Sequence, residues 1–297
     1  MKKLLALLIA LCLLPAFASA ETVVTSFYPI YLFTLNLLDG VEDVTVRNLA
    51  APDTGCLHDY QLQTGDMKTL AAADVFLING AGMESYLDSV FDAFPALPVT
   101  DASRGVRLME ADMAGLSLGI ADTLFNAHIW LDPGNAALMV LNLADGLMRA
   151  MPDQATTIAA NRDAYLDRLE ALDATLHENL GALASRDIVT FHEAFPYFAK
   201  AYNLNVAAVV NRDPGDSLSP AALGELVLLI RDLGLPPLFV EPQYDDLAAQ
   251  TLARETGAAV YMLDPIVTGP VEDVPLTYYE DIMLENMRVL VEALGVE

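Results

Sequence analysis

The chain has 297 residues, of which 41 are acidic and only 15 basic, so its formal charge is −26 at pH 7. A surface this negative lacks the basic face that phosphate groups require, which excludes nucleic acid as a partner. Hydrophobic residues make up 54% of the chain, which is enough to form the cores of two domains of ordinary size.

Residues 1–20 have the pattern of a secretory signal peptide. Lys2 and Lys3 precede an apolar run, and residues 18–20 are a small-residue cleavage site. The run is too short to span a membrane, and no other segment offers ~18 unbroken apolar residues. We therefore expect a soluble mature protein that begins near Glu21, in the periplasm or at the outer face of the cell membrane.

The two cysteines indicate neither a lipid anchor nor a disulfide. Cys12 follows Leu11, where a lipoprotein signal needs a small residue, so a lipid anchor is not expected. Loss of the signal peptide leaves Cys56 as the remaining thiol, and no intramolecular disulfide can form. Cys56 could act as a soft metal ligand, but we interpret it as a small loop residue.

The first half of the mature chain alternates strand-like and helix-like patterns. Each short run of β-forming residues is followed by a segment with helical periodicity. Pro29 lies in the first turn of the first such helix, where proline is tolerated. The pattern between residues 110 and 126 is weak and indicates a surface loop. The expected strands are residues 22–27, 44–49, 74–79 and 97–100, and the expected helices are residues 28–40, 61–73, 84–94 and 135–150.

A long amphipathic helix over residues 153–184 follows, and then the alternation repeats. Apolar residues recur at threes and fours along that helix, with charged residues between them. The later strands are expected at residues 188–191, 206–210, 238–240 and 259–263, and the later helices at residues 194–202, 220–233, 245–256 and 278–294.

Such alternation predicts an α/β fold of two lobes, each with a roughly four-stranded parallel sheet flanked by helices. The long helix would join the lobes rigidly. The expected division is a signal peptide at residues 1–20, an N-terminal lobe at 21–152, a linking helix at 153–184 and a C-terminal lobe at 185–297.

Three histidines and one carboxylate lie at the ends of these elements. They are His58, His128, His192 and Asp264. Proteins with parallel sheets bind small molecules and ions beyond the carboxyl ends of the strands. Imidazole nitrogen and carboxylate oxygen are suitable ligands for zinc. The spacing alone carries little weight because it forms no local motif. We expect the four residues to meet around a metal ion in the cleft between the lobes.

Two further polar residues bear on this hypothesis. Glu241 also ends a strand, so it is either a rival fourth ligand or a partner that orients the ligands. His177 lies in the middle of the long helix among charged neighbours, and we interpret it as a partly exposed surface residue.

Several blocks of sequence, in this order along nearly the whole mature chain, carry a resemblance to a known family. They are Thr25-Ser26-Phe27-Tyr28-Pro29, His58-Asp59-Tyr60, Asn79-Gly80-Ala81-Gly82-Met83-Glu84, His128-Ile129-Trp130-Leu131-Asp132-Pro133, Phe191-His192-Glu193-Ala194-Phe195-Pro196, Phe239-Val240-Glu241-Pro242-Gln243 and Leu263-Asp264-Pro265. The chain resembles the metal-binding receptors of zinc and manganese ABC importers.

The resemblance implies that His58, His128, His192 and Asp264 hold the metal between two lobes. Histidine at the position of His192 is typical of zinc carriers, and manganese is the alternative. The implied partners are a membrane permease and its ATPase, and a monomer is expected. Many zinc receptors carry a histidine-rich loop before the second ligand; residues 110–127 contain no histidine.

The resemblance thus implies a high-affinity carrier and no enzyme, since four protein ligands leave no open position for an activated water. Three alternatives stay open at this point. An exported zinc hydrolase would bind metal through three histidines and a water. A receptor for an organic iron chelate would need a broad, arginine- or aromatic-lined cleft, and an adhesin would use the same fold for surface contact.

Overall fold

The computed structural model describes residues 20–51, 54–55, 57, 60–110, 125–210, 219–243 and 247–295. His58 and Cys56 lie outside these residues, as do the expected signal peptide apart from Ala20 and most of the expected loop at 110–126. None of the helices in these ranges combines the length and the apolar character that a membrane-spanning segment requires.

The first lobe is built on a four-stranded parallel sheet with strand order β2-β1-β3-β4. Its strands are β1 (Glu21–Thr25), β2 (Val44–Asn48), β3 (Val75–Ile78) and β4 (Val99–Asp101). Its helices are α2 (Tyr28–Leu37), α3 (Thr64–Ala71), α4 (Leu87–Ala93) and α5 (Pro133–Ala150). Asp132 caps α5 by accepting a hydrogen bond from Gly134 N at 2.8 Å.

The second lobe repeats the arrangement with strand order β6-β5-β7-β8, again parallel throughout. Its strands are β5 (Asp187–Thr190), β6 (Asn205–Val209), β7 (Leu238–Val240) and β8 (Val260–Met262). Its helices are α7 (Pro196–Ala201), α8 (Pro220–Asp232), α9 (Leu247–Thr256) and α10 (Tyr278–Leu294). The lobes thus share one topology, which confirms the predicted fold class.

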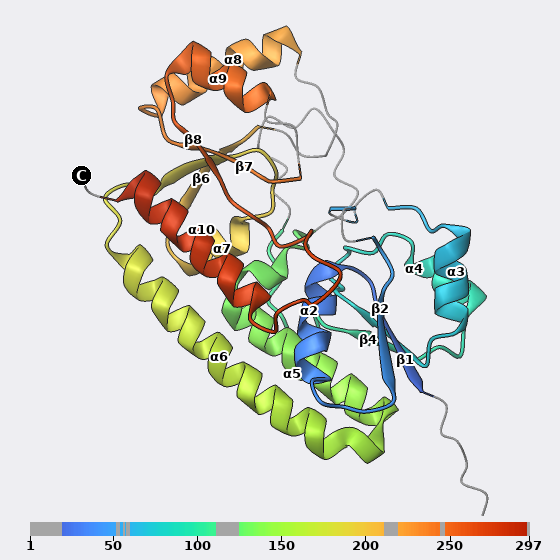
Figure 1. The fold of residues 1–297 in the computed structure, drawn as a ribbon. Coiled ribbons are helices and arrows are strands. Elements are labelled where there is room, and N and C mark those ends of the chain that lie inside the picture. Colours follow the sequence, from blue (N-terminus) through green and yellow to red (C-terminus); the bar gives the residue numbers. More distant parts are fainter. Residues whose placement is uncertain are drawn as a thin grey trace, which may run out of the picture.

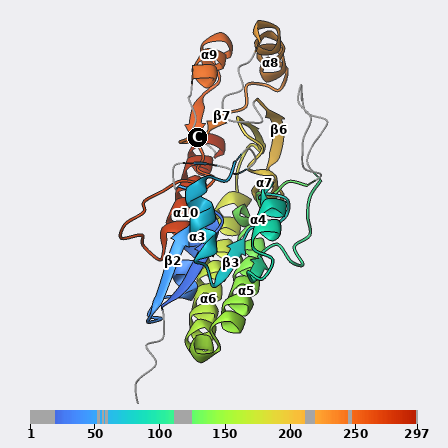
Figure 2. The same cartoon turned by 90° about the vertical axis from the view of Figure 1, so that its right-hand side faces the viewer.

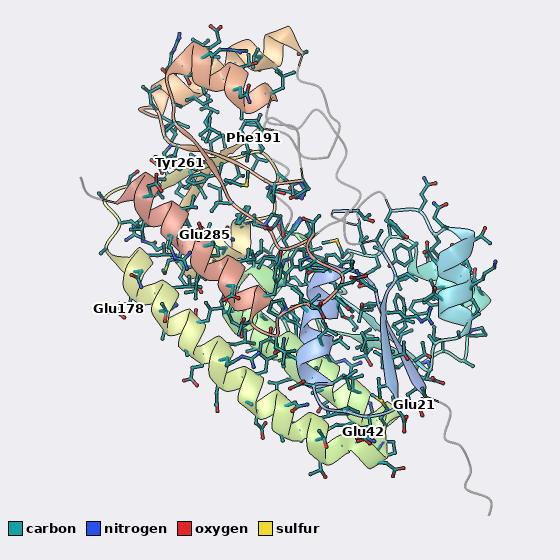
Figure 3. All side chains as sticks on the ribbon, viewed as in Figure 1. Glu21, Glu42, Glu178, Phe191, Tyr261 and Glu285 are labelled. Carbon is teal, nitrogen blue, oxygen red and sulfur yellow. The ribbon has the colours of Figure 1, made fainter. Side chains whose placement is uncertain are left out.

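The long helix α6 (Ala155–Gly181) follows a short 3₁₀ turn, η2 (Pro152–Gln154), and runs along both lobes (Figure 1). Its 27 residues extend about 40 Å at 1.5 Å per residue. Its inward stripe is apolar, and Glu178 lies on its outward side (Figure 3). The buried side chains are Ile158, Tyr165, Leu169, Leu172, Leu176 and Leu180, each worth about 2 kcal/mol of hydrophobic free energy.

The larger of two hydrophobic cores extends through both lobes and α6. It includes Val23 and Phe76 from the first sheet, Ile188 and Phe239 from the second, and Tyr165 from α6. A smaller core lies under α8 and α9, at the top of the molecule in Figure 2. The adjoining ends of α5 and α6 lie at the bottom of the same view. Because the larger core is continuous, packing holds both lobes against α6.

The segment between β8 and α10 leaves the second lobe and contacts the first. Tyr28 Oη donates a hydrogen bond to Pro270 O at 2.9 Å, and Asn36 Nδ2 donates one to Leu276 O at 3.0 Å. Tyr28 and Asn36 both belong to α2. This segment, residues 263–277, therefore ties the second lobe to the first, beside the contact made through α6.

Most expected elements form with ends shifted by a few residues, and the shifts have local causes. α4 begins at Leu87 and not at residue 84. The Glu84 carboxylate instead accepts hydrogen bonds from the backbone N–H groups of Asn79 and Gly80 in the preceding loop. α3 begins at Thr64 and not at residue 61, and it is capped at Gln63, whose N–H donates to Asp66 Oδ2 at 2.6 Å. α6 begins at Ala155 because residues 152–154 form the 3₁₀ turn.

Candidate metal centre

Two buried histidines, one from each lobe, meet at their Nε2 atoms. His128 immediately precedes the 3₁₀ turn η1 (Ile129–Leu131), and His192 lies two residues after β5. Their side chains are 0% and 1% exposed, and their Nε2 atoms are 3.0 Å apart. Two imidazole nitrogens bound to one tetrahedral zinc ion are about 3.3 Å apart, given zinc–nitrogen bonds near 2.05 Å. The pair therefore fits a shared metal ion with little movement.

Asn126 orients the ring of His128. Its Oδ1 accepts from the backbone N of His128 at 3.0 Å and lies 3.2 Å from the ring Nδ1. Its Nδ2 donates to Glu193 O at 2.8 Å, which fixes the amide orientation. An amide oxygen beside Nδ1 favours the tautomer with hydrogen on Nδ1, which places the lone pair on Nε2, the atom that faces His192.

Trp130 connects the His128 turn to the segment that carries Asp264. Its Nε1 donates to Pro265 O at 2.7 Å, and its own carbonyl accepts from Tyr279 Oη at 2.7 Å. The ring of Trp130 also lies 5.2 Å from the ring of His128. Two candidate ligands from distant parts of the chain are thus held by one fully buried indole.

Asp264 follows β8 and is fixed through its backbone by Asn286 of α10. Its N–H donates to Asn286 Oδ1 at 2.8 Å, and its carbonyl accepts from Asn286 Nδ2 at 2.7 Å. Its own Oδ1 accepts from Ile266 N at 2.7 Å. Burial raises the pKa of Asp264, and the hydrogen bond from Ile266 opposes that rise.

Glu241 follows β7 directly and is a buried carboxyl, at the same end of the second sheet as the half-buried Asp264. It is 2% exposed, and its Oε2 accepts from Gln243 Nε2 at 2.6 Å. Burial raises the pKa of Glu241 well above its ordinary value; the Gln243 hydrogen bond opposes the rise and the charge of Asp264 adds to it. A cation between the two carboxyls would relieve this repulsion.

The structure brings together part of the predicted ligand set. His128 and His192 lie side by side, Asp264 and Glu241 interact electrostatically with each other, and His58 is outside the described residues. Among the residues that are described, no three or more His, Cys, Asp or Glu side chains are grouped closely enough to hold a metal ion. The described geometry therefore supports a two-histidine centre with carboxyls at the same edge of the second sheet.

His177 is a surface residue, as its place in the long helix indicated. Its side chain is 56% exposed and its Nε2 lies 3.6 Å from Asp173 Oδ1. Its ring packs edge-on against Tyr202, with 4.9 Å between the ring centroids. It plays no part in the pair formed by His128 and His192.

The sequence did not point to three residues that orient the site: Asn126, Gln243 and Asn286. Asn126 and Gln243 each lie two residues from a candidate ligand, a spacing that could have drawn attention to them. Asn286 is 2% exposed and lies between the buried Met283 and Leu290 on α10. A buried asparagine within an apolar helical stripe needs a polar partner, and that was the available signal.

Comparison with known proteins identifies the family. The model of the ZnuA family, described as zinc-uptake complex component A, periplasmic, matches residues 23–293. The zinc-binding lipoprotein AdcA of Streptococcus pneumoniae is 28% identical over 98% of this chain and 60% of AdcA. The high-affinity zinc uptake system protein ZnuA of Bacillus subtilis is 27% identical over 93% of this chain and 88% of ZnuA.

Solved structures agree with the fold. The protein FpvC from Pseudomonas aeruginosa, solved in complex with Mn²⁺, has a TM-score of 0.80 and 26% identity, and the match covers 93% of this chain and 98% of FpvC. Zn(II)-bound AdcA from Streptococcus pneumoniae also has a TM-score of 0.80, over 58% of its own length. The chain spans about half to three fifths of the length of the streptococcal relatives that it matches.

Proposed function

This chain belongs to the family of periplasmic zinc-uptake components, which are solute-binding proteins and not enzymes, and we propose that it captures a divalent metal ion outside the cytoplasm for an ABC importer. The substrate is Zn²⁺, with Mn²⁺ as the alternative. The observation that carries the proposal is the meeting of His128 and His192 at 3.0 Å between their Nε2 atoms. Each lobe supplies one of the two nitrogens.

In this proposal His58, His128, His192 and Asp264 form the ligand set. Three imidazoles and one carboxylate match the nitrogen-rich, four-coordinate shell that zinc prefers, whereas manganese favours oxygen ligands. Glu241 supports Asp264 from the neighbouring strand or replaces it as the fourth ligand. Four protein ligands close the shell, which suits reversible capture and disfavours the alternative of an exported zinc hydrolase.

The remaining parts of the chain have roles that follow from this one. Residues 1–20 direct export and are removed, residues 21–152 and 185–297 form the lobes, and residues 153–184 link them. The mature protein works as a monomer in the periplasm or at the outer face of the membrane, and a permease with its ATPase receives the metal. Intact mass of the exported protein distinguishes a cleaved soluble form from a lipid-anchored one.

The test is calorimetric titration of the mature, metal-stripped protein with Zn²⁺ and, separately, with Mn²⁺. One tight zinc site is expected, and it should be largely lost in His192→Ala. His177→Ala is the matched control, because this histidine is exposed and contacts Asp173 and Tyr202, and it should titrate like the unmodified protein.

Other outcomes separate the alternatives. A tighter site for Mn²⁺ than for Zn²⁺ would replace zinc by manganese as the substrate. Absence of a tight site for either ion would overturn the receptor proposal. Comparison of Asp264→Asn with Glu241→Gln identifies the fourth ligand, since loss of a ligand weakens binding more than loss of a neighbouring carboxyl.

A further inference from the structure

The loop between β3 and α4 is held in shape by the carboxylate of Glu84. Its Oε1 accepts from Asn79 N at 2.7 Å and its Oε2 from Gly80 N at 3.0 Å, and the residue is 4% exposed. Three successive residues of this loop have positive φ: Gly80 at 77°, Ala81 at 54° and Gly82 at 85°. A left-handed alanine is unfavourable by itself, so the buried carboxylate supplies the contacts that maintain this path.

The loop reaches the histidine segment through the side chain of Asn79. This side chain is fully buried, and its Nδ2 donates to Gly80 O at 2.9 Å and to Ala127 O at 3.0 Å. Both acceptors are carbonyl oxygens, so the amide nitrogen must face them. Asn79 therefore connects the end of β3 to the residue that immediately precedes His128.

The contact with Ala127 bears on the direction of the His128 side chain. The carbonyl of Ala127 and the N–H of His128 belong to one planar peptide unit. The N–H end of that unit donates to Asn126 Oδ1 at 3.0 Å, and the carbonyl end accepts from Asn79. Both ends of the plane are thus held, and the tilt of this plane helps to set where the imidazole of His128 lies.

We propose that Asn79, held in place by Glu84, is a positioning residue of the metal site that fixes the peptide plane entering His128. The proposal rests on the proposed function, because it assumes that His128 binds the substrate metal. Binding sites must hold their ligands within about 10–20° of the productive orientation. Loss of the Asn79 contact should let this plane tilt, so that His128 moves from its productive orientation and metal binding weakens.

If Asn79 only stabilised the first lobe, its loss would lower the Tm and leave zinc affinity unchanged. Ala127 O also accepts from Ile129 N at 2.8 Å, so removal of the Asn79 amide does not leave this carbonyl without a hydrogen bond. Removal of the Asn79 amide should therefore change the orientation of the peptide plane more than the stability of the lobe.

The experiment compares Asn79→Ala with Asn142→Ala in the mature protein. Asn142 is the matched control because its Nδ2 also donates to two backbone carbonyls in the first lobe, Ala102 O and Arg104 O, both at 2.8 Å. Zinc affinity is measured by competition with a chelating dye, site geometry by the visible absorption spectrum of the Co²⁺-loaded protein, and stability by Tm. Asn79→Asp, which keeps the shape of the side chain, is the second variant if Asn79→Ala does not fold.

We expect Asn79→Ala to weaken zinc binding by about 10–100-fold, the usual effect of removing a partner that orients a ligand. Its Co²⁺ spectrum should also change. Asn142→Ala should keep its zinc affinity within about twofold of the unmodified protein, even if its Tm falls by as much as that of Asn79→Ala. A folded Asn79 variant that binds zinc as tightly as Asn142→Ala would overturn the proposal.

A measurement without metal separates this inference from the receptor function. The chain has four histidines, so selective ¹⁵N labelling of their rings gives a spectrum that can be assigned. In the metal-free protein, Asn79→Ala should shift the ring signals of His128 and leave those of His177 unchanged. If the unmodified protein bound no zinc, the receptor proposal would fail, and unchanged His128 signals would separately overturn the positioning role.

Discussion

Arg168 of α6 and Glu280 of α10 form an ion pair, with Arg168 Nε 2.8 Å from Glu280 Oε1. The guanidinium also contacts Asn36 Oδ1 of α2 and lies 4.6 Å from the centre of the Tyr165 ring. Arg168 therefore joins the linking helix to α10 of the second lobe and to α2 of the first. The Glu280 side chain is 10% exposed and that of Arg168 38% exposed, so solvent screens the pair only in part.

Arg168→Ala should lower the free energy of unfolding by about 2 kcal/mol, because it leaves the buried Glu280 carboxylate without its cation. The control is Arg162→Ala on the same helix. Arg162 pairs with Asp163 at 2.7 Å, but Asp163 is 66% exposed, and such pairs contribute about 0.5 kcal/mol or less. Urea denaturation of both variants tests the difference, and equal losses would contradict it.

Asn126→Ala should weaken zinc binding by about 10–100-fold, because the Nδ1 atom of His128 loses the acceptor that sets its tautomer. Asn161→Ala is the matched control; its Nδ2 also donates to two backbone carbonyls, Leu37 O and Asp39 O, far from His128 in sequence. Chelator competition measures both affinities. Retention of full affinity in Asn126→Ala would show that this amide does not orient the ligand.

Glu84 should make stability depend on pH. Burial raises its pKa to about 7, against the opposing backbone hydrogen bonds from Asn79 and Gly80. A carboxyl with a raised pKa in the folded state contributes stability below about pH 4.5 that is lost as the pH rises through about 7. The difference in unfolding free energy between the unmodified protein and Glu84→Gln should therefore fall by about 3 kcal/mol over that range. Urea titrations at pH 4.5, 6 and 7.5 measure it, and a constant difference would refute the assignment.

Two helical glycines should respond oppositely to alanine. A Cβ at Gly146 of α5 would overlap the side chain of Thr100 in β4, whereas a Cβ at Gly224 of α8 meets no atom within 4 Å. Gly146→Ala should therefore destabilise the protein by about 1–3 kcal/mol. Gly224→Ala should stabilise it by about 0.5–1 kcal/mol through helix propensity. Thermal denaturation of the two variants checks both signs, and a stabilised Gly146→Ala would contradict the close packing of α5 on β4.

Much of the fold could be predicted from sequence because it follows from local periodicity. α10 begins and ends where its pattern does, at Tyr278 and Leu294, and α8 begins at Pro220 as expected, after the capping residue Ser219. The error at α4 has another origin. Residue 84 fits a helical pattern, yet its side chain satisfies two backbone N–H groups of the preceding loop, a contact that periodicity does not encode.

The site could be predicted only in part for a similar reason. Histidines at the ends of strands can be found from sequence, and two of them do meet. The residues that orient them depend on contacts between distant segments, such as Asn126 with Glu193 and Trp130 with Pro265. An isolated asparagine or tryptophan carries no sign of such a partner until the two lobes are assembled.

The contacts between α2 and residues 263–277 also constrain the order of folding. Tyr28 and Asn36 bond to residues that lie 242 and 240 positions later in the chain. During synthesis or export from the N-terminus, these residues become available only when nearly the whole chain has emerged. The contacts of α2 therefore form only after the second lobe has been made, although the strands of the first lobe come first in the chain.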